Sequence, residues 1–217
     1  MAETCRLTPA TREEWLALRR TQGIGGSEAA AVVGMSPWMS SFDLWRIKTG
    51  KEAEPDISDR ADVAEGVRME PALRMLFAAR HPEFTVEHHP FDMVYQSDRP
   101  HSFSTLDGEF YPNGMPERRR VLEFKKCAPP NRAKWEEWDG GVPQHYYVQV
   151  LKHLLDTGYE GETLMAALIR QSGEIIIREY EFTRADCADD MAWLAGQIDD
   201  FWSNVRSGRI PPQKLTL

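Results

Sequence analysis

The stretch from Ser104 to Lys126 constrains this chain more than any other, because it sets acidic and basic side chains at defined positions on candidate strands. Residues 121–125 read Val-Leu-Glu-Phe-Lys, and this alternation of apolar and charged residues is typical of a short strand. Successive strand side chains point to opposite faces. Leu122 and Phe124 are therefore expected to enter a core, while Glu123 and Lys125 share the other face.

A second strand-like run, residues 102–106, ends at Asp107, and Gly108 is expected to turn the chain away behind it. If the two runs pair, Asp107, Glu123 and Lys125 meet at one point. Carboxylate oxygens beside a cation are suited to binding a divalent metal and a phosphate. An ordinary interpretation stands beside this one, since a Glu and a Lys two apart are commonly a solvated pair and Asp-Gly is commonly a turn.

Composition indicates which class of protein carries this candidate site. The chain has 217 residues, 41% of them hydrophobic, which suits one globular domain. No apolar run approaches the roughly 18–20 residues that span a bilayer, and the N-terminus lacks the apolar segment of a secretion signal. The three scattered cysteines suggest reduced thiols and a cytoplasmic location. A net charge of −8 argues against coating nucleic acid by charge alone, although an enzyme can still grip DNA in a confined channel.

Periodicity and capping residues divide the chain into alternating helical and extended segments. Helices are expected over residues 10–20, 28–33, 42–49, 59–80, 144–156 and 185–205. Strands are expected over residues 85–88, 91–95, 102–106, 121–125, 163–170 and 174–182, with a hairpin turn at Ser172-Gly173. This order predicts an α/β fold: a single domain over residues 1–217 with a small mixed sheet flanked by helices.

Several helical positions are candidate functional residues with equally ordinary alternatives. Thr11 is expected to cap the first helix and Ser27 the second, after a glycine-rich turn that either cradles phosphate or forms a helix–turn–helix corner. Glu70 lies in the long helix near the edge of an apolar stripe, so it is either exposed or aimed inward. Gln149 lies near the apolar side of its helix, where a core-edge hydrogen bond is the common role. The stripe beside Glu70 comprises Val63, Val67, Leu73, Leu76 and Phe77.

Eight segments, taken in order, resemble one known family. They are Trp15-x-x-x-Arg19, Gly23-Ile-Gly-Gly-Ser27-Glu-Ala-Ala, Gly34-Met-Ser-Pro37-Trp38, Leu44-Trp45, Glu65-Gly-x-x-x-Glu70-Pro71, Thr105-Leu-Asp107-Gly108, Leu122-Glu123-Phe-Lys125 and Val142-Pro143-x-x-Tyr146-Tyr147-x-Gln149-Val150. Together they resemble the lambda-exonuclease/YqaJ-type viral recombination nucleases, which have the PD-(D/E)XK restriction-endonuclease-like fold. The resemblance covers about residues 12–160 and leaves a hairpin and a C-terminal helix over residues 161–217.

The resemblance assigns roles to particular residues of this chain. It implies that Asp107, Glu123, Glu70 and the backbone carbonyl of Phe124 hold the metal, and that Lys125 orients or activates the attacking water. It further implies that the 5′-terminal phosphate is held by a set of polar side chains, namely Arg19, Ser27, Thr105 and Gln149. Two departures matter: Thr105-Leu106 stands where the family commonly has Ser-Pro, and one extra residue between Trp15 and Ser27 leaves Arg20 as an alternative to Arg19.

The chemistry of the assigned residues agrees with the resemblance. Carboxylates suit Mg²⁺ or Mn²⁺ rather than zinc, and two ions would stabilise the attacking and leaving oxygens. The resemblance implies 5′→3′ degradation of one strand of duplex DNA, with release of mononucleotides and a 3′ overhang. It also implies a homotrimeric ring, a single-strand annealing protein as partner, and a bacterial or prophage origin.

Some alternatives remain open from the sequence. The chain could instead be a structure-specific or nicking endonuclease of the same fold, or a catalytically silent DNA-binding module. Clustered acids argue against the silent module, because without a metal they repel DNA. His88 and His89 are expected at the surface, and Arg118–Arg120 form either a solvated turn or a contact to a phosphate backbone. Three tryptophans could serve a subunit contact, a DNA wedge or ordinary packing: Trp38, Trp135 and Trp138.

Overall fold

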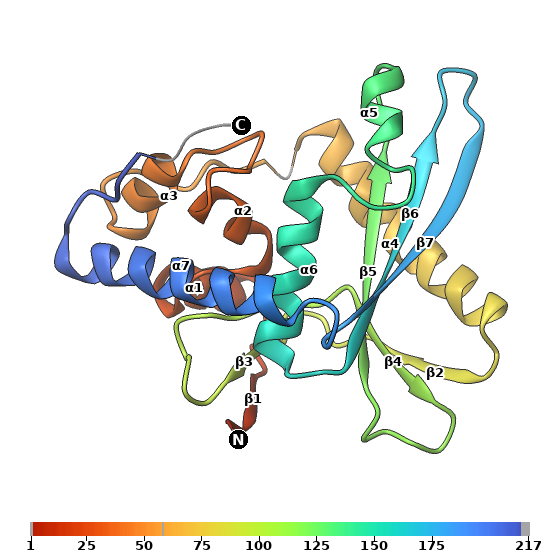
Figure 1. Ribbon diagram of the computed structural model, residues 1–217, viewed down its shortest axis with the longest axis horizontal. Helices are drawn as coiled ribbons and strands as arrows, with labels where there is room; N and C mark the ends of the chain where they lie inside the picture. The colour runs from red at the N-terminus through yellow and green to blue at the C-terminus, as the bar shows by residue number, and fades with distance from the viewer. Residues whose placement is uncertain (1, 58, 214–217) are drawn as a thin grey trace.

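A five-stranded mixed sheet lies at the centre of the computed structural model, which describes residues 2–57 and 59–213 (Figure 1). The order of its strands is β2-β4-β5-β6-β7, and β5 and β6 run parallel while the other neighbours are antiparallel. Their bounds are β2 (Phe84–Glu87), β4 (Gly108–Pro112), β5 (Arg120–Cys127), β6 (Gly161–Ile169) and β7 (Ile175–Thr183). The predicted fold class and the hairpin are confirmed.

Strand β5 separates the two layers of the core. Leu122 and Phe124 pack on one face against α4 (Ala61–Arg80), through Leu73 and Phe77. Glu123 and Lys125 occupy the opposite face, as the alternation of β5 predicts. That face is covered by α6 (Gln144–Thr157), so the two charged residues lie between a strand and a helix (Figure 1).

The larger hydrophobic core lies on the α6 side of the sheet. There α6 contacts both α7 (Ala188–Ser207) and α2 (Ala29–Val32). The remaining elements surround this core: β1 (Thr4–Leu7) paired with β3 (Met93–Gln96), α1 (Arg12–Gln22), a 3₁₀ turn (Gly26–Glu28), α3 (Ser41–Lys48) and α5 (Arg132–Glu136). In residues 2–57 and 59–213 no helix combines the length and the apolar character that crossing a membrane demands.

Thr11 caps α1, accepting a 3.2 Å hydrogen bond from the backbone amide of Glu14, as predicted. The prediction that Ser27 caps the next helix is wrong. Gly25 is the capping position, and its amide donates to the Glu28 carboxylate at 2.7 Å. Ser27 lies inside the 3₁₀ turn with an exposed side chain, which leaves its hydroxyl accessible.

The strand expected over residues 102–106 is also corrected by the structure. This segment forms two isolated bridges, Ser102 with Ile24 and Ser104 with Val94, rather than a strand. The strand begins at Gly108 instead and pairs with Leu122 of β5. Gly108 therefore leads into the sheet rather than away from it, and Asp107 is placed at the start of β4 instead of at the end of an earlier strand.

The apolar stripe predicted along α4 is only partly buried. Leu73 and Phe77 pack under the sheet, whereas Val67 is 58% exposed and Leu76 is 37% exposed. The two buried residues are one helical turn apart, and they face Phe110 and Leu122. The N-terminal half of α4 therefore extends beyond the core and carries Glu70 along its half-buried side.

Candidate active site

Asp107, Glu123 and Lys125 come together where the start of β4 meets the middle of β5. The Asp107 carboxylate accepts a hydrogen bond of 3.0 Å from the backbone amide of Phe124. The Lys125 ammonium forms a short ion pair with Glu123 Oε1. The predicted convergence of these side chains is therefore present, although the connecting strand differs from the expected one.

Glu123 is the most enclosed member of the group, with 2% exposure. Its Oε1 atom also accepts a hydrogen bond of 2.8 Å from the Gln149 amide on α6. Its Oε2 atom is buried and has no hydrogen-bond partner among the described residues. A buried carboxylate oxygen normally has a partner, so the free oxygen is suited to a ligand such as a cation.

The environment of Asp107 and Glu70 favours their protonated forms. Burial, followed by the charge of Glu123, raises the pKa of Asp107 to about 7. Burial, followed by the charge of Asp107, raises the pKa of Glu70 to about 7. Like charges in a desolvated site disfavour ionisation, and a bound cation would relieve this repulsion.

The same site favours the charged form of Lys125. Burial acts to lower the pKa of Lys125, but the carboxylates of Glu123 and Asp107 outweigh it and raise this pKa. Lys125 is therefore a cation in the free protein. Its ammonium also lies 5.2 Å from the centre of the Tyr146 ring, which forms one wall of the site.

Arg74 joins α4 to the start of β4. Its guanidinium donates to the backbone carbonyl of Asp107 at 2.6 Å and 3.2 Å. Glu70 lies one helical turn before Arg74, on the same side of α4. This contact brings Glu70 close enough to Asp107 for the charge of Asp107 to affect its pKa.

The carboxylates are neighbours but do not form a closed ligand shell. In residues 2–57 and 59–213 no three His, Cys, Asp or Glu side chains surround a point that could hold a metal ion. The donor set is nevertheless made of carboxylate oxygens, which hard divalent cations prefer. Together with the unpartnered Oε2 of Glu123, this chemistry fits Mg²⁺ or Mn²⁺.

The candidate phosphate-binding residues form a second group beside the acids. Arg19 donates to the Ser27 hydroxyl at 3.4 Å, and its guanidinium lies 5.3 Å from the Trp15 ring centre. The Trp15 indole donates in turn to the Thr105 hydroxyl at 2.9 Å. Arg20 is exposed. The structure thus brings together Arg19, Ser27 and Thr105, and it directs Arg19 rather than Arg20 toward them.

Buried ion pairs hold Arg19 in place. The Lys48 ammonium donates to the Arg19 backbone carbonyl at 3.0 Å and pairs with Glu28 at 2.8 Å. The Arg19 guanidinium lies 3.9 Å from Glu28 and 3.9 Å from Glu54. Burial acts to raise the pKa of Glu28, but Lys48 and Arg19 outweigh it and lower this pKa.

Gln149 connects the two groups through a histidine that sequence reasoning missed. Its amide nitrogen lies 3.4 Å from His153 Nε2, one turn further along α6. His153 is fully buried, and its Nδ1 lies 3.2 Å from both carboxylate oxygens of Glu162 on β6. The same imidazole packs against Gly26, beside Ser27. The four-residue spacing of Gln149 and His153 is the sequence signal that places both on one helical face.

The remaining candidates have separate outcomes. Trp138 is 2% exposed and is a packing residue, whereas Trp135 is half-buried and Trp38 is 65% exposed. His88 and His89 are at the surface, as predicted. Two residues of the arginine run contact acids on the edge strands of the sheet, Arg119 with Glu87 of β2 and Arg120 with Glu181 of β7.

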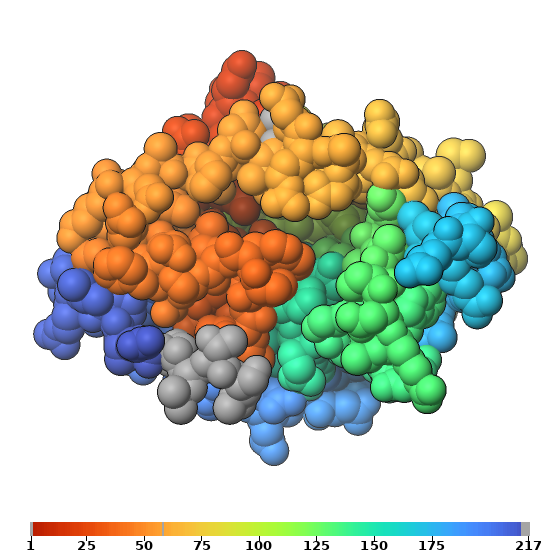
Figure 2. All heavy atoms as spheres, turned by 90° about the horizontal axis from the view of Figure 1, so that it is seen from above, coloured from red at the N-terminus to blue at the C-terminus, as the bar shows by residue number. Residues whose placement is uncertain are grey.

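One face of the molecule is hollowed beside α6, the helix that carries Gln149. Figure 2 shows a hollow between the orange segment around α3 and the green segment that contains the end of β5 and α5. The teal start of α6 lies between these segments, and α6 carries Gln149 further along.

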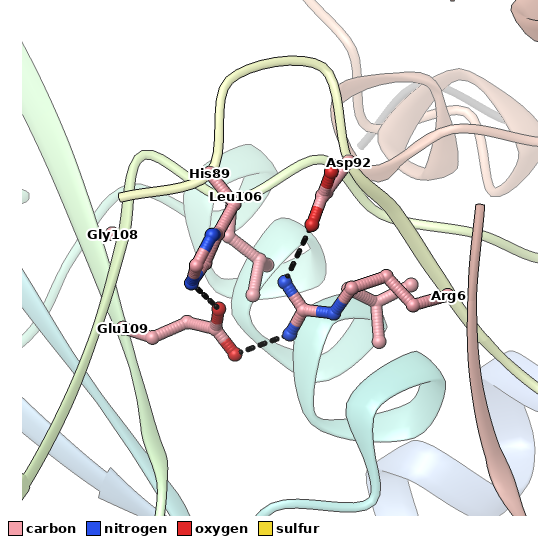
Figure 3. Close-up of a pocket in the computed structure, with 7 residues that line it drawn as sticks. Arg6, His89, Asp92, Leu106, Gly108 and Glu109 are labelled. Carbon is pink, nitrogen blue, oxygen red and sulfur yellow. Dashed lines mark hydrogen bonds and ion pairs between the residues drawn. The ribbon is translucent and has the colours of Figure 1, made fainter. Parts of the chain in front are cut away.

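A separate pocket, shown in Figure 3, lies next to Asp107, and its charged side chains hold two strands together. Arg6 of β1 donates to Asp92 at 2.9 Å and to Glu109 at 2.7 Å, and His89 lies 3.9 Å from Glu109. The Tyr159 hydroxyl donates to Glu109 at 2.6 Å. These charges pair with one another, so the pocket fixes β1 against β4.

These features define a restriction-endonuclease-like α/β domain with an acidic site at the junction of two central strands. A model of the YqaJ-like viral recombinase domain matches residues 14–160, and the chain belongs to this family. It is 29% identical over 208 residues to the uncharacterised protein YqaJ of Bacillus subtilis (strain 168), covering 93% of this chain and 59% of that protein. The chain thus spans about three-fifths of that relative's length.

Solved structures share the fold at low sequence identity. An alkaline exonuclease (LHK-Exo) from Laribacter hongkongensis superposes with a TM-score of 0.62, at 16% identity, covering 90% of this chain and 93% of the other. LHK-Exo in complex with dAMP gives a TM-score of 0.64, again covering 90% of this chain and 93% of the other. A phage related exonuclease from Haemophilus somnus 129PT gives 0.55 at 8% identity, covering 87% and 96%.

Proposed function

We propose that this protein is a metal-dependent 5′→3′ exonuclease on linear double-stranded DNA. It would release 5′-mononucleotides and leave a 3′ single-stranded overhang for recombination by strand annealing. The observation that carries the proposal is the group formed by Asp107, Glu123 and Lys125, in which a buried carboxylate oxygen of Glu123 has no hydrogen-bond partner among the described residues.

Mg²⁺, or Mn²⁺ in its place, would be held by the carboxylates of Asp107 and Glu123, with Glu70 and the carbonyl of Phe124 completing the set. When bound, two such ions would supply Lewis-acid stabilisation of the attacking and leaving oxygens. Lys125 would orient the attacking water and offset negative charge on the phosphate. Its ion pair with Glu123 supports this role, because it holds the ammonium beside the proposed metal ligands.

The phosphate-binding group would set the polarity of digestion. A terminal phosphate carries more charge than an internal diester, and arginine, hydroxyl and amide donors match it. Arg19 and Ser27 lie within hydrogen-bond distance of each other, so one phosphate can contact both. With Thr105 and Gln149 they would hold the 5′ end and place the next phosphodiester bond at the acids.

Assembly and location are part of the same proposal. A homotrimeric ring around the duplex would keep the enzyme on its substrate, because a threaded duplex dissociates slowly. The proposed partner is a single-strand annealing protein that binds the 3′ overhang. The proposed setting is the cytoplasm of a bacterium, with the gene carried by the host or a prophage.

Nucleotide release from a 5′-phosphorylated linear duplex in Mg²⁺ tests the proposal. Wild type is expected to release mononucleotides, to leave a sealed circular plasmid intact, and to stop when the metal is chelated. Asp107→Ala is expected to lose activity and to keep binding to DNA ends. Cleavage of the sealed circle would instead identify an endonuclease, and near-wild-type activity of Asp107→Ala would exclude this carboxylate as a ligand.

A further inference from the structure

Trp38 is 65% exposed, although it lies on a segment whose backbone is firmly fixed. The amides of Met35 and Ser36 donate to the Ala30 carbonyl at 2.8 Å and 3.1 Å. The Ser36 hydroxyl then accepts hydrogen bonds of 3.3 Å from the amides of Trp38 and Met39. The segment is therefore a short rigid turn that presents an indole to solvent.

This turn lies beside the start of α6. It belongs to the orange segment that faces the teal start of α6 and the green end of β5 in Figure 2. The Trp38 ring lies edge-on to the His145 ring, with 5.0 Å between centres. His145 is in the first turn of α6, the helix that carries Gln149. The exposed indole thus packs against α6, which contributes Gln149 to the candidate site.

A chain of rings connects Trp38 to the reacting groups. The centres of the Trp38 and Tyr146 rings are 6.5 Å apart, and the Lys125 ammonium lies 5.2 Å from the Tyr146 centre. These separations place the indole within about 12 Å of the ammonium, a few steps of a stacked strand at about 3.4 Å each. A DNA strand with its scissile phosphate at Lys125 therefore has a nucleobase within reach of Trp38.

We propose that Trp38 is a stacking platform for a nucleobase near the DNA end, a subsite distinct from the metal and phosphate groups. The inference rests on the proposed nuclease function and adds a base contact to it. An exposed aromatic ring on a rigid turn binds the face of any base, because every base has a π-face. The base belongs either to the hydrolysed strand or to its complement, and the same stacking chemistry serves both.

A 2-aminopurine scan tests the subsite directly. The fluorescent base is placed at each of the first four positions of either strand, in a 5′-phosphorylated duplex with phosphorothioate linkages that resist hydrolysis. On binding wild type in Mg²⁺, one position is expected to change its fluorescence several-fold, and that position identifies the strand. Trp38→Phe is expected to keep the change, and Trp38→Ala to lose it and to bind the duplex about 5- to 100-fold more weakly.

Trp193→Ala is the matched control, because Trp193 is 49% exposed on the surface of α7. It is expected to keep both the fluorescence change and the affinity. An unchanged signal in Trp38→Ala would overturn the proposal, and so would a smaller assembly by light scattering, which would make Trp38 a subunit contact. If wild type neither binds nor digests duplex ends, the proposed function fails; if wild type does both and Trp38→Ala matches it, the subsite alone fails.

Discussion

Asp107 accepts a 3.0 Å hydrogen bond from the backbone amide of Phe124, the residue between Glu123 and Lys125. One acid is thus fixed to the strand that carries the other two charged groups. Because Phe124 itself packs into the core on the α4 side, the amide cannot shift without moving β5. The position of Asp107 is therefore set by the sheet as well as by any ligand.

Asp107→Asn and Asp107→Ala are expected to separate the structural and chemical roles of this residue. Asparagine keeps an oxygen that accepts from Phe124 and removes a charge whose burial raises the pKa. Alanine leaves the amide without this acceptor, at a cost of about 1–3 kcal/mol. In metal-free buffer at pH 8, the melting temperature of Asp107→Asn should equal or exceed that of wild type, and the melting temperature of Asp107→Ala should be lower. Both should lack nuclease activity, and equal destabilisation would contradict this assignment.

The raised pKa values of Asp107 and Glu70 predict how stability depends on pH in the absence of metal. Between about pH 4 and pH 7 the folded carboxyls hold protons that the unfolded chain has released. The free energy of unfolding should therefore fall as pH rises through this window. The measurement is the melting temperature across pH 5 to pH 8 in chelator, compared with Glu70→Gln/Asp107→Asn, whose slope should be smaller.

Divalent metal should oppose this loss, because a metal held by the proposed ligands would bind the ionised carboxylates. Mn²⁺ is expected to raise the melting temperature more at pH 8 than at pH 5.5, and by about 2–4 °C for each kcal/mol of binding in a chain of this size. The double variant should show little response to Mn²⁺. An equal rise in the double variant would show that the ion binds elsewhere.

Arg19 and Arg20 provide a matched pair for testing the proposed phosphate-binding residues. Arg19 contacts Ser27 and is held by Lys48, whereas Arg20 is exposed. Losing a charge-assisted hydrogen bond to phosphate typically costs about 10- to 100-fold. Arg19→Ala should therefore erase the preference for a 5′-phosphorylated over a 5′-hydroxyl duplex, and Arg20→Ala should keep it. The reverse result would move the role to Arg20.

The parts of the site that follow local rules were predictable from the sequence. Alternation along β5 put Glu123 and Lys125 on one face, and helical spacing put Arg19 one turn after Trp15. Strand β4 was missed because it begins with Gly108 and ends with Pro112, residues that ordinarily mark turns. Its pairing with β5 is decided by the sheet, and local sequence carries little of that information.

The buried polar side of α6 was missed for a different reason. Lys152 and Asp156 are fully enclosed, and their charges are satisfied by each other and by distant groups. Ser102 and Ser104 donate to Asp156 at 2.6 Å and 2.7 Å, across more than 50 residues of chain. Charged residues are ordinarily expected at the surface, and partners so far away in sequence cannot be found from periodicity.

Gly26→Ala should disturb the contact between the turn that carries Ser27 and the buried His153 beside the acidic site. An added Cβ would lie 2.8 Å from His153 Nε2, and this imidazole cannot withdraw because it is buried against Glu162. Displacing either group is expected to lower the melting temperature and to weaken the 5′-phosphate preference together. Gly25→Ala is the control, since its Cβ would be 3.4 Å from the Glu28 carboxylate and its capping amide is kept. If both variants behave like wild type in unfolding and in digestion of phosphorylated ends, the packing of Gly26 on His153 does not position the residues proposed to bind the 5′-phosphate.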